Sequence, residues 1–369
     1  MLKEVTRFYV LRVILWGLVL FPMCSSIYGG TPFEAHSRYF SKNITRSNNF
    51  SEVNPRFVNN GDQVLFLVFT GNPESPMPWD YVLTKSDRDG HIANYLSSHG
   101  VLDYAVLSND GGILVLRAAP SIYSIDVKNT PYEAIRDWEL WYINISNEEE
   151  VLVETSMGLP LSEGYRMLGL VDLPNNELGR IVSASPQKST QLQAELVRNG
   201  DFWFFEFYHI QPHSRSKLIF ESECWRSYSD VQWWPEITWI DDHRFITIGF
   251  NSFSDEDFPQ SEGLFSIVTV NLLSGESEII YSDYDLRPFP KFVLNSSATV
   301  LYFQKSTQDV TELWKLNLEN RDAEMMYRVI GELGEVRLSS DESSLVFTQL
   351  FENNFDIIRL DMERGRIER

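Results

Sequence analysis

The chain has 369 residues and a formal net charge of −21, with 52 acidic against 31 basic side chains. So strong an acidic balance repels nucleic acid and anionic membranes, which excludes a nucleic-acid-binding protein. Its two cysteines exclude a disulfide framework, so the fold must depend on a packed core, for which 24 Phe and 10 Trp supply apolar surface.

The first 30 residues differ from the rest of the chain. Lys3, Arg7 and Arg12 precede an apolar run at residues 13–23, and small residues follow that run. This order is typical of a secretory signal peptide, and the apolar run is too short to span a bilayer comfortably. The sequence therefore predicts a signal peptide at residues 1–30 and export to the periplasm or the cell exterior.

Two alternatives for this segment remain. An uncleaved anchor helix would need the apolar run to extend back to Phe8 across Arg12. A lipoprotein would use Cys24, but Met23 stands before it where a small residue is expected. After signal cleavage we expect no membrane span and a monomeric protein.

Residues 31–52 are polar and rich in Ser, Asn and Arg, which predicts a linker or a segment that closes the fold. An array of sheets must join its last sheet to its first, because an open sheet edge is a liability. We therefore expect a segment near residues 38–40 or residues 56–58 to pair with the final sheet.

One phrase recurs along the remaining chain. Its first half is a turn rich in Asp, Asn, Ser and Gly that leads into a β-branched or aromatic strand. Asp and Asn tolerate left-handed backbone conformations and bond their own backbone, so they favour tight turns. Copies stand at residues 59–69, 109–116, 175–182, 241–248, 295–303 and 339–348, the copy at 175–182 being the weakest.

The second half of the phrase alternates apolar and polar residues, which is typical of a half-buried strand. Two close copies are Glu-Leu-Trp segments at residues 139–145 and 312–318, and further copies stand at 263–271 and 356–365. Helical periodicity is scarce, so the pattern predicts an all-β fold built from repeated small sheets.

This phrase resembles the repeat of TolB-like and WD40-like β-propellers, whose blades carry a turn similar to Ser-Pro-Asp-Gly between two strands. Ser339-Ser-Asp-Glu corresponds to that turn, as does Ser108-Asn-Asp-Gly. The resemblance implies a β-propeller of four-stranded blades over residues 53–369, with six blades or, as the alternative, seven. It leaves no room for the additional N-terminal domain of TolB, and because the motif is structural it supplies no catalytic residues.

Catalytic motifs are absent from the sequence. There is no Gly-x-Ser-x-Gly elbow, no phosphate-binding loop and no His-Glu-x-x-His. Cys224, beside Trp225, has the setting of a buried small hydrophobe rather than a nucleophile. Asp241 and Asp242 are the only adjacent acidic pair at a repeat turn, and turn chemistry accounts for them.

Aromatic and acidic loops are the candidate contact sites. Trp233 and Trp234 precede Pro235 in a loop between two blades, where an exposed aromatic ring would supply binding energy, and Trp79 follows a Pro-rich loop. Trp239, by contrast, occupies a core position of the repeat.

Asp255, Glu256 and Asp257 form an acidic loop whose carboxylate oxygens would suit Ca²⁺. No regular calcium-binding pattern accompanies them, so we expect no cofactor, with calcium as a weak alternative.

These observations predict an exported, non-catalytic propeller that binds a protein, or a glycan, in the cell envelope through loops on one face. The alternative is a propeller enzyme that acts on saccharides or esters with paired carboxylates in its channel. A purely structural accessory is the third possibility.

Overall fold

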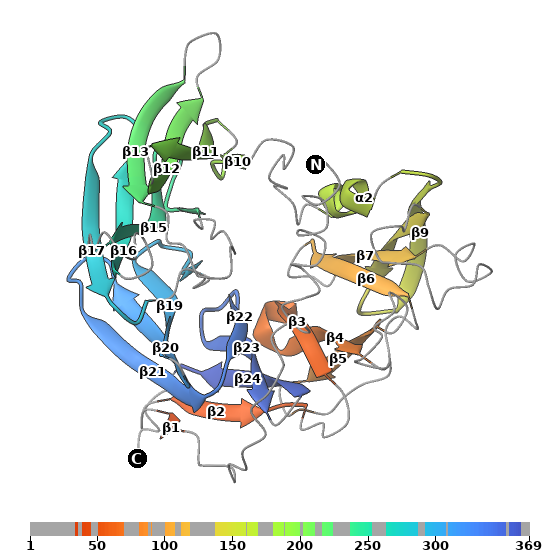
Figure 1. The fold of residues 1–369 in the computed structure, drawn as a ribbon. Helices are drawn as coiled ribbons and strands as arrows, with labels where there is room; N and C mark the ends of the chain where they lie inside the picture. Colours follow the sequence, from red (N-terminus) through yellow and green to blue (C-terminus); the bar gives the residue numbers. More distant parts are fainter. Residues whose placement is uncertain are drawn as a thin grey trace. The chain divides into compact units, whose positions relative to one another are not determined.

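The computed structural model describes residues 34–35, 39–45, 51–69, 81–87, 90, 100–107, 112–118, 137–159, 161–168, 180–187, 189–199, 202–210, 216–223, 237–252, 263–286, 292–307, 309–351 and 354–362. These residues form six antiparallel sheets, of which one has five strands, four have four strands and one has three strands. The chain divides into two compact units, Met1–Phe33 with Ser37–Val171 and Leu333–Arg369, and Glu34–His36 with Asp172–Glu332. Each unit contains three of the sheets (Figure 1).

Two sheets of the first unit follow each other in the chain. The first contains β3 (Ser51–Val58), β4 (Gln63–Phe69) and β5 (Tyr81–Asp87), with the short 3-10 turn η1 (Asn59–Gly61) between β3 and β4. The second contains β6 (Val101–Val106), β7 (Gly112–Ala118), β8 (Trp138–Asn144) and β9 (Glu149–Ser156), and is followed by helix α2 (Leu161–Met167).

The last sheet of the chain also belongs to the first unit. It contains β22 (Leu333–Leu338), β23 (Ser344–Phe351) and β24 (Asn354–Asp361), and its outer strand is β2 (Phe40–Asn43). Of the two segments proposed to pair with the final sheet, the first does so, because Phe40 stands opposite Asp361 and Asn43 opposite Ile358. Residues 56–58 instead belong to β3 and pair with β4.

The second unit holds the other three sheets. Its first sheet has β10 (Arg180–Ala184), β11 (Gln191–Asn199), β12 (Phe202–Ile210) and β13 (Lys217–Glu223). Its second sheet has β14 (Thr238–Trp239), β15 (Arg244–Ser252), β16 (Gly263–Asn271) and β17 (Ser277–Asp283). Its third sheet has β18 (Val293–Leu294), β19 (Val300–Ser306), β20 (Val310–Asn317) and β21 (Ala323–Ile330), with β1 (Glu34–Ala35) added outside β21.

Hydrogen bonds explain why the polar turns of the repeat precede the second strand of a sheet. The backbone N–H of Ser339 donates to the carbonyl of Ser344 at 2.9 Å, and the N–H of Ser344 donates to Ser339 Oγ at 3.0 Å. Asn295 and Val300 form the same pair of bonds, at 3.0 and 2.8 Å, with Asn295 Oδ1 as the side-chain acceptor. A short polar side chain at this position therefore satisfies the first N–H of the strand.

The same bonds correct one copy of the repeat. Ser185 N–H donates to the Thr190 carbonyl at 2.9 Å, and Thr190 N–H donates to Ser185 Oγ at 3.2 Å. The turn of this sheet is therefore at residues 185–190, before β11, and the copy predicted at residues 175–182 was wrong because β10 is the first strand. The acceptor here is a serine hydroxyl, as at Ser339, but the turn contains no Asp, Asn or Gly, which is why the repeat was not recognised at this place.

The six sheets, each built from consecutive antiparallel strands, are the blades of a β-propeller. This confirms the all-β fold and the count of six predicted from the repeat. Two blades differ from the four strands predicted. In the described part of the chain the sheet of β3, β4 and β5 has three strands, and the sheet that includes β1 has five.

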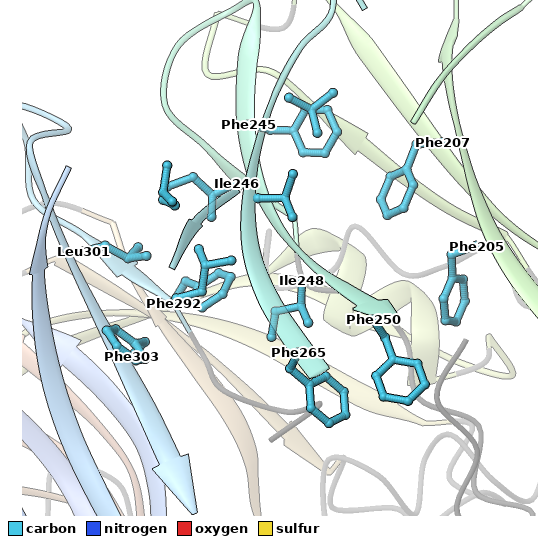
Figure 2. Packing of buried hydrophobic residues seen from close by; sticks show 14 of the residues in the cluster. Phe205, Phe207, Phe245, Ile246, Ile248, Phe250, Phe265, Phe292, Leu301 and Phe303 are labelled. Atoms are coloured by element: carbon cyan, nitrogen blue, oxygen red, sulfur yellow. The ribbon is translucent and has the colours of Figure 1, made fainter. Parts of the chain in front are cut away.

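The core of the second unit is a continuous apolar cluster centred on β15. Figure 2 shows Ile246 and Ile248 between the side chains of Phe205 and Phe207 and those of the following sheet. Phe207 lies 5.8 Å from Phe245 between ring centroids, and both rings are fully buried. Burying each such ring contributes roughly 1.5–3 kcal/mol, so this packing holds the three sheets of the unit together.

In the first unit, strand β4 is buried on both faces. Leu65 and Leu67 face a cluster shared with β6, β7 and β8, whereas Val64, Phe66 and Val68 face a cluster shared with β23 and β24. Because the strand has an apolar partner on each side, it forms a continuous apolar run instead of an alternating pattern.

The first Glu-Leu-Trp copy forms a defined side-chain group on the sheet of β8. Trp141 Nε1 donates to Glu139 Oε2 at 2.9 Å, which is possible because residues two apart on a strand share a face. The Arg117 guanidinium of β7 lies 5.0 Å from the Trp141 ring centroid, and it also forms an ion pair with Glu150 of β9 at 3.1 Å.

The second copy builds the same group in the other unit. Trp314 Nε1 donates to Glu312 Oε2 at 2.8 Å, and Lys305 Nζ lies 4.5 Å from the Trp314 ring centroid. Lys305 also forms an ion pair at 2.6 Å with Asp283, which lies on β17 of the preceding sheet. The repeat thus places a cation over each Trp, and here that cation links two blades.

The Asp283–Lys305 pair predicts a pH-dependent contribution to stability. Burial would raise the pKa of Asp283, but Lys305 and the backbone N–H of Asp285 lower it below the ordinary 3.8. Burial would lower the pKa of Lys305, but Asp283 raises it above the ordinary 10.5. The contribution is therefore full between these ordinary values, is lost as pH falls through the depressed pKa of Asp283, and is lost as pH rises through the raised pKa of Lys305.

We expect Asp283→Asn to lower the free energy of unfolding by about 1–2 kcal/mol at pH 7. In urea titrations the difference from wild type should shrink once the pH falls below the ordinary value of 3.8 toward the depressed pKa of Asp283, so that it is smaller at pH 3 than at pH 7. Glu276→Gln, which removes an exposed carboxylate close by in the chain, is the control and should be neutral at both pH values. A constant deficit from pH 3 to pH 7 would contradict the electrostatic origin.

Candidate partner-binding surface

The loops that the sequence singled out lie outside the described residues. This applies to Trp79, Trp233, Trp234, Asp255, Glu256 and Asp257, and to both cysteines. Their roles as contacts, and the calcium alternative at the acidic loop, therefore stay predictions. Within the described residues, no group of three or more His, Cys, Asp or Glu side chains is arranged to hold a metal ion.

The acidic pair at the turn before β15 has a structural role. Asp241 Oδ1 accepts the N–H groups of His243 and Arg244, both at 2.8 Å, and its other oxygen pairs with the Arg244 guanidinium. Burial would raise the pKa of Asp241, but these bonds lower it below its ordinary value. Asp242 Oδ1 accepts the N–H of Gln187 at 3.1 Å, which connects this turn to the preceding sheet. These contacts account for both carboxylates without general acid–base chemistry.

Trp239 belongs to the core side of the same turn, as its position in the repeat predicted. Its ring is half-buried and lies 5.9 Å from Phe245 between centroids, and its Nε1 donates to Ser183 Oγ at 2.9 Å. Its indole therefore joins two blades instead of facing a partner.

A polar cluster joins the innermost strands β3 and β6 of the first unit. Asp103 Oδ1 accepts the Asn54 side-chain amide at 2.6 Å and the Tyr104 N–H at 2.7 Å. The Tyr104 hydroxyl donates to the carbonyl oxygens of Asn54, at 2.5 Å, and Leu65, at 2.9 Å, and burial raises the Tyr104 pKa. Asn54 has a φ of 55°, and these bonds hold the bulge that it forms in β3. Asp103 thus accepts structural hydrogen bonds, which a general base would need to give up.

The largest group of exposed large apolar side chains in the described chain lies on and after strand β9. Val151, Leu152 and Val153 follow one another on the strand and are 49%, 45% and 50% exposed. Met157 and Leu159 directly after the strand are also exposed. We call Val151, Leu152 and Val153 the β9 patch. Contiguous exposed apolar residues of this kind mark interaction surfaces in soluble proteins.

The pairing of β9 with β8 decides which face each residue of the strand occupies. Trp141 stands opposite Leu152 and Leu140 opposite Glu154, so Val153 is an extra residue in β9. This bulge places Glu149, Val151 and Glu154 on one face of the sheet, with Leu152 on the other. The apolar patch is therefore flanked on one face by two carboxylates.

The charges around the β9 patch are only partly neutralised. Glu148 pairs with Lys85 at 2.9 Å and Glu150 pairs with Arg117 at 3.1 Å. Glu149 and Glu154 are exposed and form no ion pair with the part of the chain that the structure describes. The surface thus combines an apolar strand with two available negative charges.

Helix α2 covers the inner part of the same face. Leu161, Tyr165 and Leu168 pack with Leu116 and Trp138 of the sheet. Gly164 permits this approach, because a Cβ atom there would lie 2.7 Å from a Leu116 methyl group. The helix therefore seals the blade near its inner strands and leaves β9 at the uncovered outer edge.

A signal for the β9 patch is present in the sequence. Three consecutive apolar residues at 151–153 stand between glutamates, whereas a half-buried strand alternates. The repeat predicted the Glu-Leu-Trp strand at residues 139–145 but gave no prediction for the strand that follows it.

No family model matches this sequence, and a search of curated proteins found no match. Among solved structures the chain is similar to TolB from Acinetobacter baumannii, with 12% identity and a TM-score of 0.40 over 82% of this chain and 64% of TolB. It is also similar to an oligogalacturonate lyase in complex with manganese, with 9% identity and a TM-score of 0.36 over 87% of this chain and 79% of the lyase. A third is the β-propeller domain of the Trilobed protease from Pyrococcus furiosus, with 11% identity and a TM-score of 0.34 over 86% of each chain.

These similarities, at identities of 12% or below, concern the fold alone. The chain spans under two thirds of the length of TolB. Among the described residues, no helix is both long enough and apolar enough to cross a membrane.

Proposed function

We infer that the protein is an exported, non-catalytic β-propeller that binds a protein partner in the cell envelope. The observation that carries this proposal is the β9 patch, which exposes three consecutive large apolar side chains on an otherwise acidic protein. Exposing such a surface to water is unfavourable unless a partner covers it. Export rests on the charged and apolar pattern of residues 1–30.

Binding is preferred over catalysis because three carboxylates that could have served as a general acid or base have structural partners. Asp241 and Asp242 hold the turn before β15, and Asp103 holds the bulge of β3. A general acid or base must be free to exchange a proton with a substrate. The loops with Trp79, Trp233 and Trp234, and the acidic loop at residues 255–257, remain proposed additional contacts.

Capture from the native envelope tests this function. The exported protein should retain one specific protein, and a variant with Val151→Lys and Leu152→Lys should lose it, since the change introduces charge without touching the core. Ile279→Lys on β17 is the matched control, because Ile279 is also exposed, at 53%, on an outer strand. The proposal fails if wild type retains no protein and instead turns over members of a glycan panel.

A further inference from the structure

Outer blade edges in this protein accept added strands. β1 pairs antiparallel with β21, and β2 pairs antiparallel with β24, although both added strands precede the first blade in the chain. In each case the added strand lies outside a blade that is otherwise built from consecutive strands (Figure 1). An outer edge of this fold is therefore competent for strand addition.

Strand β9 corresponds in detail to β21, which carries an added strand. Both follow a Glu-Leu-Trp strand, and in both the pairing shifts by one residue at the same point. Val153 thus corresponds to Met326, and Glu154 corresponds to Tyr327. Since β1 pairs at Tyr327, the bulge shared by both strands is compatible with an added neighbour.

Burial at the corresponding positions is opposite. Met326 and Tyr327 of β21 are 0% and 1% exposed. Val153 of β9 is instead 50% exposed, and Glu154 is exposed as well. Among the described residues β9 pairs only with β8, so its outer edge is open. The outer strands β13 and β17 expose one large apolar residue each, Leu218 and Ile279, so β9 is the more apolar edge.

The charges on β9 select the kind of strand that fits. If two copies of β9 paired antiparallel about their centres, Glu149 would stand near Glu154 of the other copy, and like charges opposite each other destabilise a sheet. A second copy of this chain is therefore disfavoured. A strand with Lys or Arg at both ends of a short apolar run would instead pair each free carboxylate with a cation.

We propose that the outer edge of β9 binds an extended segment of another protein, added antiparallel as a further strand of the blade. The segment carries two basic residues four positions apart, which face Glu149 and Glu154 as Asn144 and Leu140 of β8 do, and β-branched residues between them, which cover the β9 patch. This inference rests on the proposed function and specifies the chemistry of the partner.

The test uses capped peptides and the exported protein. The probe Lys-Thr-Val-Thr-Lys, flanked by Gly-Ser on each side, has the proposed spacing, and binding is followed by fluorescence anisotropy at low salt. The acidic counterpart with Glu at both basic positions should bind at least tenfold more weakly. A counterpart with Pro in place of both Thr residues lacks backbone donors and should also bind at least tenfold more weakly.

A charge exchange distinguishes specific pairing from general attraction to an acidic protein. Glu149→Lys with Glu154→Lys should reverse the preference, so that the acidic peptide binds more tightly than the basic one. A control that exchanges two exposed acids elsewhere, Glu276→Lys with Glu278→Lys on and before β17, should keep the preference for the basic peptide. Hydrogen exchange of wild type should show amides of residues 149–155 protected by the basic peptide.

Each other outcome overturns the inference. Equal binding of basic and acidic peptides, or a control variant that reverses as fully as the β9 variant, removes the charge selection. Peptide binding without amide protection on β9 removes strand addition. An envelope protein that depends on the β9 patch but protects no β9 amide would likewise overturn strand addition while leaving the proposed function in place.

Discussion

Replacing Arg359 with methionine is expected to lower the free energy of unfolding by about 3–5 kcal/mol, because buried partners lose their cation. Arg359 is 2% exposed, and its guanidinium donates to the Gly61 carbonyl at 2.7 Å, to Ser344 Oγ at 2.8 Å and to Asp361 Oδ1 at 2.9 Å. It also lies 5.4 Å from the ring centroid of Phe57. Methionine fills the volume but leaves these acceptors unsatisfied.

The matched control for this prediction is Arg321→Met. Arg321 forms an ion pair with Glu278, but the two side chains are 52% and 60% exposed. Such a pair contributes at most about 1 kcal/mol, so the midpoint of thermal or urea unfolding should shift only slightly. If both variants lose the same free energy of unfolding, the buried hydrogen bonds of Arg359 stabilise the protein no more than the exposed ion pair does.

Ile44→Ala is expected to lower the free energy of unfolding by about 2–4 kcal/mol, since it opens a cavity between two blades. Ile44 directly follows β2, is 3% exposed, and donates its N–H to the Ile357 carbonyl at 2.9 Å. Its side chain packs in one cluster with Phe66 of the first blade and Val346 of the last. Ile44 therefore links the N-terminal segment to the first blade and to the last blade.

Urea unfolding followed by tryptophan fluorescence measures this loss. Ile279→Ala removes the same atoms from an exposed position on β17 and should change stability by less than about 0.5 kcal/mol. A deficit for Ile44→Ala no larger than that of the control would mean that the N-terminal segment adds little to the stability of the first unit.

The repeat predicted the fold because it records local chemistry. The turn at residues 339–344 places a side-chain acceptor opposite the first N–H of a strand, and the turn that begins at Asn295 does the same. The Glu-Leu-Trp phrase likewise records a bond between residues two apart on one strand face. Contacts within a few residues of each other leave a pattern in sequence that can be counted.

The turn at residues 185–190 was missed because different residues can perform the same task. Ser185 accepts the strand N–H through its hydroxyl, as Asn295 does through its amide oxygen. Residues 185–190 contain no Asp, Asn or Gly, so the prediction instead chose the Asn-rich segment that begins at residue 175, ten positions too early. A search by residue type fails where the shared feature is an acceptor oxygen at the first position of the turn.

The candidate site was predicted less well than the fold. Alternation identifies a strand but does not say whether a neighbour covers it. In the described part of the chain no strand pairs with the outer edge of β9, where residues 151–153 are exposed. The counterpart at Met326 is equally apolar in sequence and is fully buried. The difference lies in chain segments far away, which local patterns do not record. The aromatic and acidic loops favoured from composition lie outside the described residues, so those predictions still await their test.

The N-terminal strands β1 and β2 have a consequence for how the protein is made. The Asn43 side-chain amide donates to Asp356, 313 positions later in the chain, so β2 is synthesised long before the strand with which it pairs. Contacts of such long range make folding slow, because a large loop must close before they form. The sheet of β2, β22, β23 and β24 therefore stays incomplete in a nascent chain until β24 has been synthesised, although its outer strand β2 is the first of the four to be made.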